Sequence, residues 1–546
     1  MRRFLIPTLV VALALLVAVP SFALEVKYGG LFRARVLNDH NFTDYGYPNA
    51  ALAYPQATAA NANGTGIRAG GVPYVPHMNR FDQRIRMYFD FISSENLKVV
   101  TRLEANSVWG AYGNPGARNV VGGGNVGADN NNLGIKNAYV EFKIPNTMLK
   151  AKVGVQGIAL LDSWIIDSDF SAAVVTADLK PFTVVLGYAA GQNYSTVMES
   201  DNVDDLVAVV AYKEGPFNAG LTFLWQDAHN TPASVFPTIG ALQDDPVQTN
   251  VTFLRSFNSG ANYANPYFPG LFITTQRNNL FDLGVQLGYK IDYLSVYINF
   301  VKNFGSVKLS NVATANTEPG ADTNIRVNTN NFPGLSMINP HTADYTGWMI
   351  DAGVNYFCGP FTANLGGFYT SGQKLNFNTA NGQPANINNP QVITTNGNDI
   401  STFVYPLATS KYFSELMGGG ILDNAAPNGG YWRGYPAPTN IWTITLGGAY
   451  QLLPTTKMAM SYWYFGTSEK VPSKFNPQTG TWDTSSNLGH ELDMVITQNI
   501  VDKLNLDLVG AVMFTGQAYR ARSTNVRYTG GDQNAYELGA RLQWAF

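Results

Sequence analysis

Long parts of this chain alternate apolar and polar side chains with a period of two. Over 281–290 the odd positions, from Phe281 to Tyr289, are apolar, and the even positions, from Asp282 to Lys290, are polar or glycine. Successive side chains of a β-strand point to opposite faces of the sheet, so this period predicts strands with one apolar and one polar face. Strands of a membrane barrel need these two faces, one toward lipid and one toward the lumen.

The alternation recurs along the whole chain. It predicts eighteen strands, at 25–37, 79–93, 97–106, 135–144, 149–157, 172–179, 182–191, 204–213, 216–226, 279–290, 293–303, 345–357, 361–370, 441–452, 456–466, 488–500, 504–514 and 534–546. Eighteen is an even number, as a bacterial barrel with both chain ends in the periplasm requires. A single miscounted hairpin would reduce the number to sixteen, which is the second choice.

The connections between these strands alternate strictly in length. Tight turns lie at 94–96, 145–148, 180–181, 214–215, 358–360 and 453–455. Long connections, rich in Asn, Gly, Pro and Thr, lie at 38–78, 107–134, 227–278, 304–344, 371–440 and 467–487. This pattern predicts an all-β protein, a transmembrane antiparallel up-and-down β-barrel with short periplasmic turns and long extracellular loops.

The N-terminus has the layout of a secretory signal peptide. Arg2 and Arg3 form a short basic region, an apolar run follows over 4–19, and Ser21-Phe22-Ala23 supplies small residues at the positions that a signal peptidase reads. The apolar run is shorter than the roughly 20 residues that a membrane-spanning helix needs. We therefore expect residues 1–23 to be cleaved and residues 24–546 to form a single barrel domain.

The last strand ends on an aromatic residue. Leu542, Trp544 and Phe546 share one face of it, and the chain stops at Phe546. This ending resembles the C-terminal signature of outer-membrane barrels, and the resemblance implies that the barrel-assembly machinery recognises these three residues. Together with the signal peptide, it predicts a location in the outer membrane of a Gram-negative cell, in contact with lipid and lipopolysaccharide.

Composition excludes several other classes of protein. Aromatic and charged residues are equally common, at 13% each, whereas soluble domains carry about 25% charged residues. Without Arg2 and Arg3 the chain keeps 33 basic against 38 acidic residues, a net charge of −5. A mildly acidic chain does not suit nucleic-acid binding, which needs a basic surface.

Signatures of catalysis are missing as well. The chain has no GxxxxGK[ST], HExxH or CxxCH motif, its five His residues lack metal-ligand spacing, and its one cysteine, Cys358, stands in a tight turn. We therefore expect no enzyme, no cofactor and no metal site.

Charged residues gather on one face of the first three predicted strands. The basic ones are Arg33, Arg35, Arg80, Arg84, Arg86, Lys98 and Arg102, and the acidic ones are Asp82, Asp90 and Glu104. An arginine facing lipid at mid-depth would cost about 2–4 kcal/mol, so this face must line the interior. It is either a basic wall that attracts anions and orients polar solutes or a salt-bridge network that stiffens the barrel, and the sequence favours neither.

The third outer loop, 158–171, offers acidic partners in Asp162, Asp167 and Asp169. The stretch 153–175 resembles the corresponding hairpin of the outer-membrane homotrimeric porin family. That resemblance implies a trimeric channel in which this loop folds inward and sets acidic groups against the basic wall. The loop is short, however, and apolar in its middle, so packing at the barrel rim stays an alternative. The predicted eighteen-stranded barrel also resembles, more distantly, the substrate-specific porins.

These features predict an outer-membrane porin, a water-filled channel for passive diffusion of ions and small polar solutes. A closed barrel of this size is too wide for side chains alone to fill. The alternative is a structural or interaction barrel, such as an adhesin or a scaffold for a partner protein. The long loops 227–278 and 371–440 could serve either function, as a pore cover or as a docking surface.

Overall fold

The computed structural model describes most of the predicted strands and parts of the loops. The described residues are 24–40, 77–109, 133–193, 202–229, 271–272, 275–309, 313–314, 342–372, 374–376, 391–392, 399–406, 411–423, 438–476, 479, 481–520 and 534–546. The predicted signal peptide, 1–23, and most of the two long loops 227–278 and 371–440 lie outside these residues.

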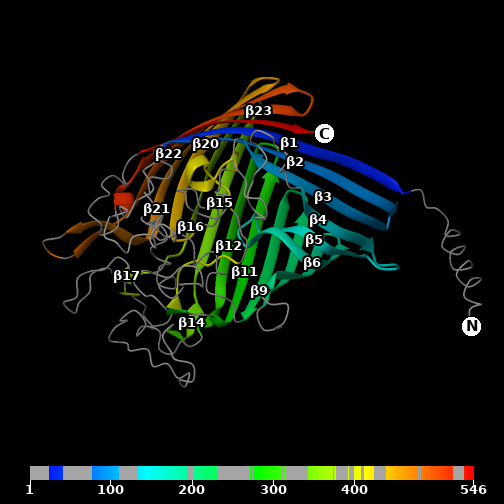
Figure 1. Cartoon of the computed structure of the whole chain (residues 1–546), viewed down its shortest axis with the longest axis horizontal. Coiled ribbons are helices and arrows are strands. Elements are labelled where there is room, and N and C mark those ends of the chain that lie inside the picture. The colour runs from blue at the N-terminus through cyan, green and yellow to red at the C-terminus, as the bar shows by residue number, and fades with distance from the viewer. Residues whose placement is uncertain are drawn as a thin grey trace, which may run out of the picture.

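Eighteen long strands form a closed antiparallel barrel, as the sequence predicts (Figure 1). In chain order they are β1 (Glu25–His40), β2 (His77–Ser94), β3 (Leu97–Val108), β4 (Leu133–Lys143), β5 (Leu149–Leu160), β6 (Ile166–Leu179), β7 (Phe182–Asn193), β8 (Asn202–Glu214), β9 (Phe217–His229), β11 (Thr275–Ile291), β12 (Leu294–Leu309), β15 (Trp348–Cys358), β16 (Phe361–Thr370), β20 (Ile441–Leu453), β21 (Thr456–Asn476), β22 (Thr481–Val501), β23 (Leu504–Thr515) and β24 (Ala535–Ala545). Each pairs with its neighbours in this order.

The ring closes between the first strand and the last. β1 pairs with β2 on one side and with β24 on the other. At the seam, Gly30 and Phe546 exchange two backbone hydrogen bonds, with N···O distances of 2.8 and 3.1 Å. Closure satisfies backbone groups that would otherwise lie unpaired in lipid.

Minor elements lie outside this ring. The short strands are β10 (Leu271–Phe272), β13 (Ala313–Thr314), β14 (Thr342–Tyr345), β17 (Leu375–Asn376), β18 (Gln391–Val392) and β19 (Asp399–Ile400). A four-residue helix, α5 (Glu415–Gly418), and a 3-10 turn, η5 (Gln517–Arg520), complete the described elements. No helix of the described residues is long and apolar enough to cross a membrane.

One predicted loop is largely strand. The sequence predicts a connection over 467–487, but β21 continues to Asn476 and β22 begins at Thr481. Lys470 and Pro472 interrupt the apolar alternation in this stretch, and the pairing register shifts on both sides of Pro472. The ends of β21 and β22 are therefore paired strands whose sequence lacks the apolar alternation, so the alternation alone does not predict them.

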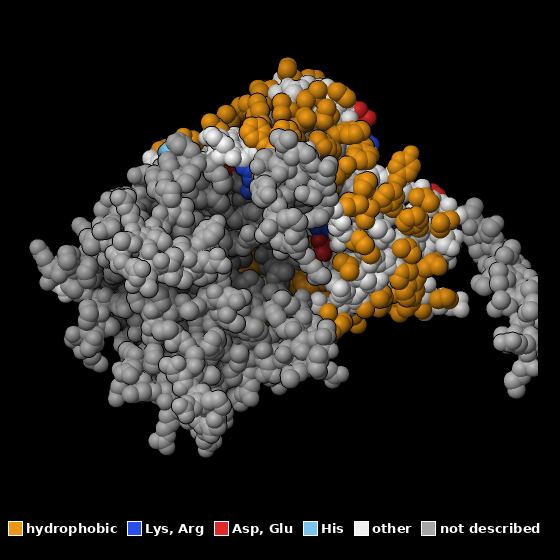
Figure 2. All heavy atoms as spheres, in the orientation of Figure 1, with side chains coloured by type: hydrophobic (Ala, Val, Ile, Leu, Met, Phe, Trp, Pro, Cys, Tyr) orange, Lys and Arg blue, Asp and Glu red, His pale blue; other side chains and the backbone are white. Residues whose placement is uncertain are grey.

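The outer surface of the barrel is apolar. Outward residues on every part of the ring keep large exposed hydrophobic side chains, among them Phe81, Ile85, Leu221, Leu446 and Leu538. In Figure 2 such side chains cover most of the visible outer face of the described strands, and charged side chains show in the hollow behind it. This distribution is typical of a barrel whose outside contacts hydrocarbon.

A second apolar cluster lies inside the ring. The turn between β5 and β6, here called the hairpin tip (161–165), packs with inward side chains of the wall and with segments 399–405 and 411–418. Its Trp164 is fully buried, 5.2 Å from the ring of Phe368 on β16 and 6.2 Å from that of Tyr405. Part of the interior is therefore filled by chain from two loops.

Candidate functional site

The structure places five of the predicted basic residues together on the inner faces of β1 and β2. This arginine cluster consists of Arg33, Arg35, Arg80, Arg84 and Arg86. Their neighbours of opposite parity on the same strands, such as Val36, Phe81 and Ile85, are exposed on the outside of the barrel.

Two wall carboxylates pair with the arginine cluster. Arg35 donates two hydrogen bonds to Asp82, of 2.8 and 2.7 Å, and Nε of Arg80 lies 3.1 Å from the same carboxylate. Glu104 on β3 accepts a 2.5 Å hydrogen bond from Arg86 and lies 3.7 Å from Arg84. These contacts join β1, β2 and β3 along the inner wall.

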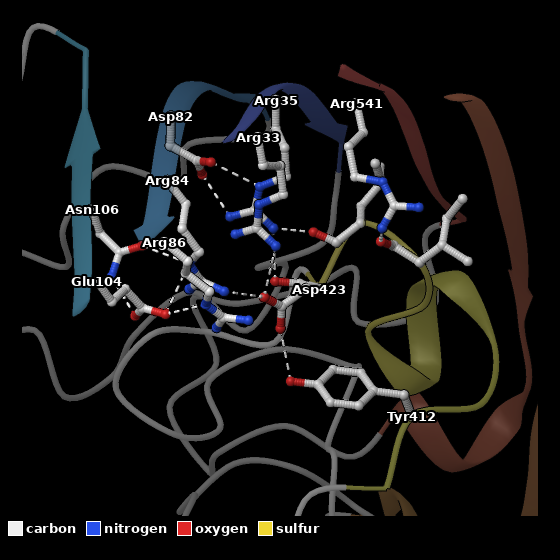
Figure 3. Close-up of polar contacts among 12 residues, drawn as sticks. Arg33, Arg35, Asp82, Arg84, Arg86, Glu104, Asn106, Tyr412, Asp423 and Arg541 are labelled. Carbon is white, nitrogen blue, oxygen red and sulfur yellow. Dashed lines mark hydrogen bonds and ion pairs between the residues drawn. The ribbon is translucent and has the colours of Figure 1, made fainter. Parts of the chain in front are cut away.

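A third carboxylate comes from a loop. Asp423 belongs to residues 411–423, here called the inner loop segment, which lies between β16 and β20 in the sequence. Its Oδ2 is 3.0 Å from Nη1 of Arg33 and 3.4 Å from Nη1 of Arg84, and its Oδ1 accepts a 2.8 Å hydrogen bond from the Tyr412 hydroxyl. Figure 3 shows the guanidinium groups of β1 and β2 pointing toward Asp423 from one side, with Tyr412 on the other.

These contacts fix the charge of Asp423. Burial alone would raise the pKa of its carboxyl, but the hydrogen bonds from Tyr412 and Arg33, and the charges of Arg33 and Arg84, bring that pKa below its usual value. Burial and the Asp423 charge together raise the pKa of the Tyr412 hydroxyl, which therefore stays a hydrogen-bond donor. At neutral pH the site thus holds an ionised carboxylate among arginines.

The arginine cluster keeps an excess of positive charge. Among the described residues, its five arginines pair with three carboxylates, those of Asp82, Glu104 and Asp423, an excess of two positive charges within this group. Asp39 on β1 also interacts with Arg80, and including its charge reduces the excess within the group to one. The side chains of Arg84 and Arg86 are 21% and 25% exposed, so these two members of the cluster are partly accessible from inside the barrel.

Further contacts fasten the inner loop segment to the wall. Arg35 donates hydrogen bonds to the carbonyls of Leu422 and Asp423, and Arg541 on β24 donates one to the carbonyl of Ile421. Leu422 is fully buried against the wall, where Gly539 leaves room for it: a Cβ at Gly539 would lie 2.3 Å from Leu422 Cδ1. Because Gly539 has no side chain, the inner loop segment can approach β24 closely at Leu422.

A group of buried carboxylates, here called the carboxylate clamp, holds the other part of the segment. Glu491 of β22 accepts hydrogen bonds from the backbone N–H groups of Leu416 and Met417, at 2.6 and 3.2 Å, and from the Ser414 hydroxyl, at 3.1 Å. Glu415 accepts the N–H of Ile421 at 3.0 Å within the segment. The third member, Asp493, follows Glu491 on the same face of β22 and lies 3.5 Å from the N–H of Glu415.

The clamp places Glu415 in an environment that disfavours its charge. The residue is only 5% exposed. Burial first, and then the nearby Asp493, raise the pKa of Glu415 to about 7, against the opposing hydrogen bonds from Ile421 and Leu422 and the charge of Arg541. Glu415 therefore binds a proton more readily than an exposed glutamate does.

The hairpin tip and the inner loop segment also meet each other. Lys411 donates a 2.7 Å hydrogen bond to the carbonyl of Asp162, and its ammonium lies 5.0 Å from the centre of the Trp164 ring. The Trp164 N–H donates a 2.7 Å hydrogen bond to Asp351 on β15. The tip is thus attached both to the wall and to the inner loop segment.

The acidic residues of the predicted third loop do not contact the arginine cluster in the described contacts. Asp162 accepts hydrogen bonds from Gln286 and Asn299, at 2.8 and 3.0 Å. Asp167 accepts one from Ser163 at 2.7 Å, and Asp169 pairs with Lys136 at 2.5 Å. The loop itself is shorter than 158–171, because β5 extends to Leu160 and β6 begins at Ile166. The hairpin tip enters the interior and does not stop at the rim.

The remaining predicted residues lie next to the site or at the seam. Arg102 pairs with Asp90 at 2.7 Å, and Lys98 with Glu141 at 3.4 Å, on the wall beside the arginine cluster. At the C-terminal end, Trp544 and Phe546 are exposed on the outer face, and Leu542 pairs in register with Ala34 of β1.

Several residues of the site cannot be found from the sequence pattern. Tyr412, Glu415 and Asp423 fall in a long loop without periodicity, and no local signal marks them. Arg541 could have been included, because it shares the inward face of β24 with Glu537 and pairs with Asp507 at 2.9 Å.

Comparison with known proteins finds similarity in structure alone. No protein-family model matches the sequence, and no curated protein matches it. Among solved structures, the outer membrane protein opdK from Pseudomonas aeruginosa is 10% identical, with 96% of this chain and 98% of that chain covered and a TM-score of 0.44. OccK5 (OpdH) of the same organism is 8% identical, with 96% and 98% covered and a TM-score of 0.46.

A third similar structure is a BenF-like porin from Pseudomonas fluorescens Pf-5, 10% identical, with 96% and 98% covered and a TM-score of 0.43. Each of these structures is similar to this chain over nearly its whole length, and the eighteen-stranded ring that the sequence predicts rests on the strand pairing of the described residues.

Proposed function

We propose that this chain is an outer-membrane porin, a channel through which ions and small polar solutes diffuse. The observation that carries the proposal is a closed barrel, apolar outside, whose inner wall keeps a partly exposed row of charged side chains. Hydrocarbon outside and solvated charge inside are what a pore through a bilayer requires.

The narrow part of this channel lies beside the docked inner loop segment, along the inner wall of β2 and β3. Arg84, Arg86 and Arg102 remain partly exposed there, whereas packed side chains line the interior from β6 to β24. Solutes would pass along this charged side. The excess positive charge there favours anions over cations of similar size.

Swelling of protein-loaded liposomes tests the proposal. The refolded chain 24–546 should let small neutral sugars pass, with a rate that falls steeply as sugar size increases. Small anionic solutes should enter faster than cationic solutes of equal size. Equal swelling with and without protein, in vesicles that demonstrably contain folded barrel, would contradict the proposal and favour the structural or interaction barrel.

Assembly and export are part of the same proposal. A homotrimer in the outer membrane, reached through a cleaved signal peptide and the barrel-assembly machinery, accords with the predicted leader and with the outward Trp544 and Phe546. Cross-linking of the purified protein in detergent would distinguish a trimer from a monomer.

A further inference from the structure

The inner loop segment is fastened to the wall by two sets of contacts that differ in chemistry. At one end Asp423 lies among Arg33, Arg84 and Tyr412, so opposite charges attract. At the other end Glu415 is buried beside Asp493 and Glu491, so like charges meet. The two ends are eight residues apart in the sequence, and movement at one end must affect the other.

We propose that the carboxylate clamp is a proton-dependent positioning device, which holds Asp423 against the arginine cluster when protonated and releases it when ionised. The proposal rests on the proposed channel function and deepens it. Three carboxylates cannot all be ionised in a buried space of this kind without mutual repulsion and loss of hydration. Docking of the segment therefore depends on proton binding within the clamp.

The groups around Glu415 come from every element packed against it. β22 supplies Glu491 and Asp493, β23 supplies Asp507, and β24 supplies Arg541, whose positive charge acts on Glu415. Arg541 itself pairs with Asp507 at 2.9 Å and is therefore partly neutralised. The clamp retains more negative than positive charge whenever all of its members ionise.

The direction of the pH effect follows from the pKa of Glu415. That pKa is about 7 in the docked segment against the ordinary 4.5, so the docked state binds the proton more tightly than a released state does. Docking is therefore favoured at acid pH and weakens as the pH rises toward 7, by on the order of a hundredfold in the docking equilibrium. Release withdraws Asp423 and leaves the arginine cluster with a larger positive excess.

Gly420, two residues after the end of α5, shows how closely the clamp encloses the carboxylate. Gly420 has a positive φ of 45°, and a Cβ there would lie 1.9 Å from Oε2 of Glu415. The turn thus folds back over the carboxylate and shields it from solvent. A charged Glu415 has no room to hydrate in place, so ionisation displaces the turn.

The test is the reversal potential of the refolded full-length barrel in planar bilayers under a KCl gradient, measured from pH 5 to pH 8. Wild-type channels should become more anion-selective as the pH rises. Deprotonation of histidines as the pH rises would make the channels less anion-selective, since it removes positive charge.

Glu415→Gln keeps the neutral shape of the protonated acid, so its reversal potential should stay at the value of the wild type at acid pH throughout the range. Glu214→Gln, at the exposed end of β8, is the matched control and should follow the wild type.

A second variant keeps the test decisive if Glu415→Gln folds poorly. Asp423→Asn removes the carboxylate that the clamp positions, so its channels should be anion-selective at every pH in the range. A wild-type profile that Glu415→Gln or Asp423→Asn leaves unchanged would overturn the inference. If no variant conducts at all, the proposed channel function fails, and this outcome is distinct from conducting channels without the pH effect.

Discussion

Arg84 and Arg86 stand at successive inward positions of β2, but their surroundings differ. Arg86 pairs with Glu104 and also interacts with Tyr88, whereas Arg84 divides its contacts among Asn106, Glu104 and Asp423. Arg35, in contrast, is fully occupied by Asp82 and two loop carbonyls. We therefore propose that the two interpretations of the charged wall apply to different residues, with Arg35 stiffening the barrel and Arg84 and Arg86 facing the proposed solute path.

This division predicts the effect of neutralising the accessible pair. In the double variant Arg84→Gln/Arg86→Gln, two positive charges leave the charged side of the interior, so the reversal potential under a salt gradient should move severalfold toward cations in permeability ratio. Lys180→Gln/Lys213→Gln, at exposed turns, removes the same charge away from the interior and is the control. An unchanged reversal potential would leave the arginines as wall bracing only.

At the scale of elements, the hairpin tip is a closely packed part of the interior. Trp164 has no exposed surface, and it combines ring contacts with the hydrogen bond to Asp351. Trp164→Ala should lower the free energy of unfolding by about 3–5 kcal/mol, as for other buried large-to-small substitutions. Trp164→Phe keeps most of the packing and loses the hydrogen bond, so we expect about 1–2 kcal/mol. Denaturant unfolding in lipid vesicles measures both, and equal losses would contradict this account of the tip.

The close approach of the inner loop segment to β24 can be disturbed from the wall. A Cβ at Gly539 would meet Leu422 at 2.3 Å, so Gly539→Ala should displace the segment and raise single-channel conductance. The matched variant Gly510→Ala, on β23, meets only Leu538 at an ordinary 3.5 Å and should conduct as the wild type does. Equal conductance in the two variants would show that the segment does not narrow the channel.

The same elements show what a sequence can and cannot reveal. Strands such as β11 follow from local alternation, because lipid on one side and the interior on the other impose it on each strand separately. The inner loop segment has no such constraint: Asp423 and Arg33, its ion-pair partner, are 390 positions apart. The sequence predicts the basic face, but it places the opposing carboxylates on the third loop, whereas Asp423 belongs to a later loop, between β16 and β20.

For the whole molecule, the closed ring is required both for burying the backbone polar groups in the membrane and for enclosing an interior. At the seam a Cβ on Gly30 would lie 2.4 Å from the Phe546 ring and 2.5 Å from the backbone oxygen of Arg86. Gly30→Ala should therefore lower the yield of closed barrel, seen as loss of the fast-migrating band of unheated protein on a denaturing gel. Gly220→Ala, whose Cβ has no neighbour nearer than 3.7 Å, is the control and should fold normally. Equal yields would show that the seam tolerates a side chain there.

The proposed channel requires a continuous water path through the closed barrel, and single-channel recording of the refolded chain in a planar bilayer under a salt gradient tests for that path most directly. We expect stepwise conductance of nanosiemens order, with a reversal potential on the anion side because the arginine cluster carries excess positive charge. Closures in groups of three would indicate a trimer. Silence from protein that is verifiably folded and inserted would contradict the account and leave a barrel whose loops, filling the interior, serve binding in place of diffusion.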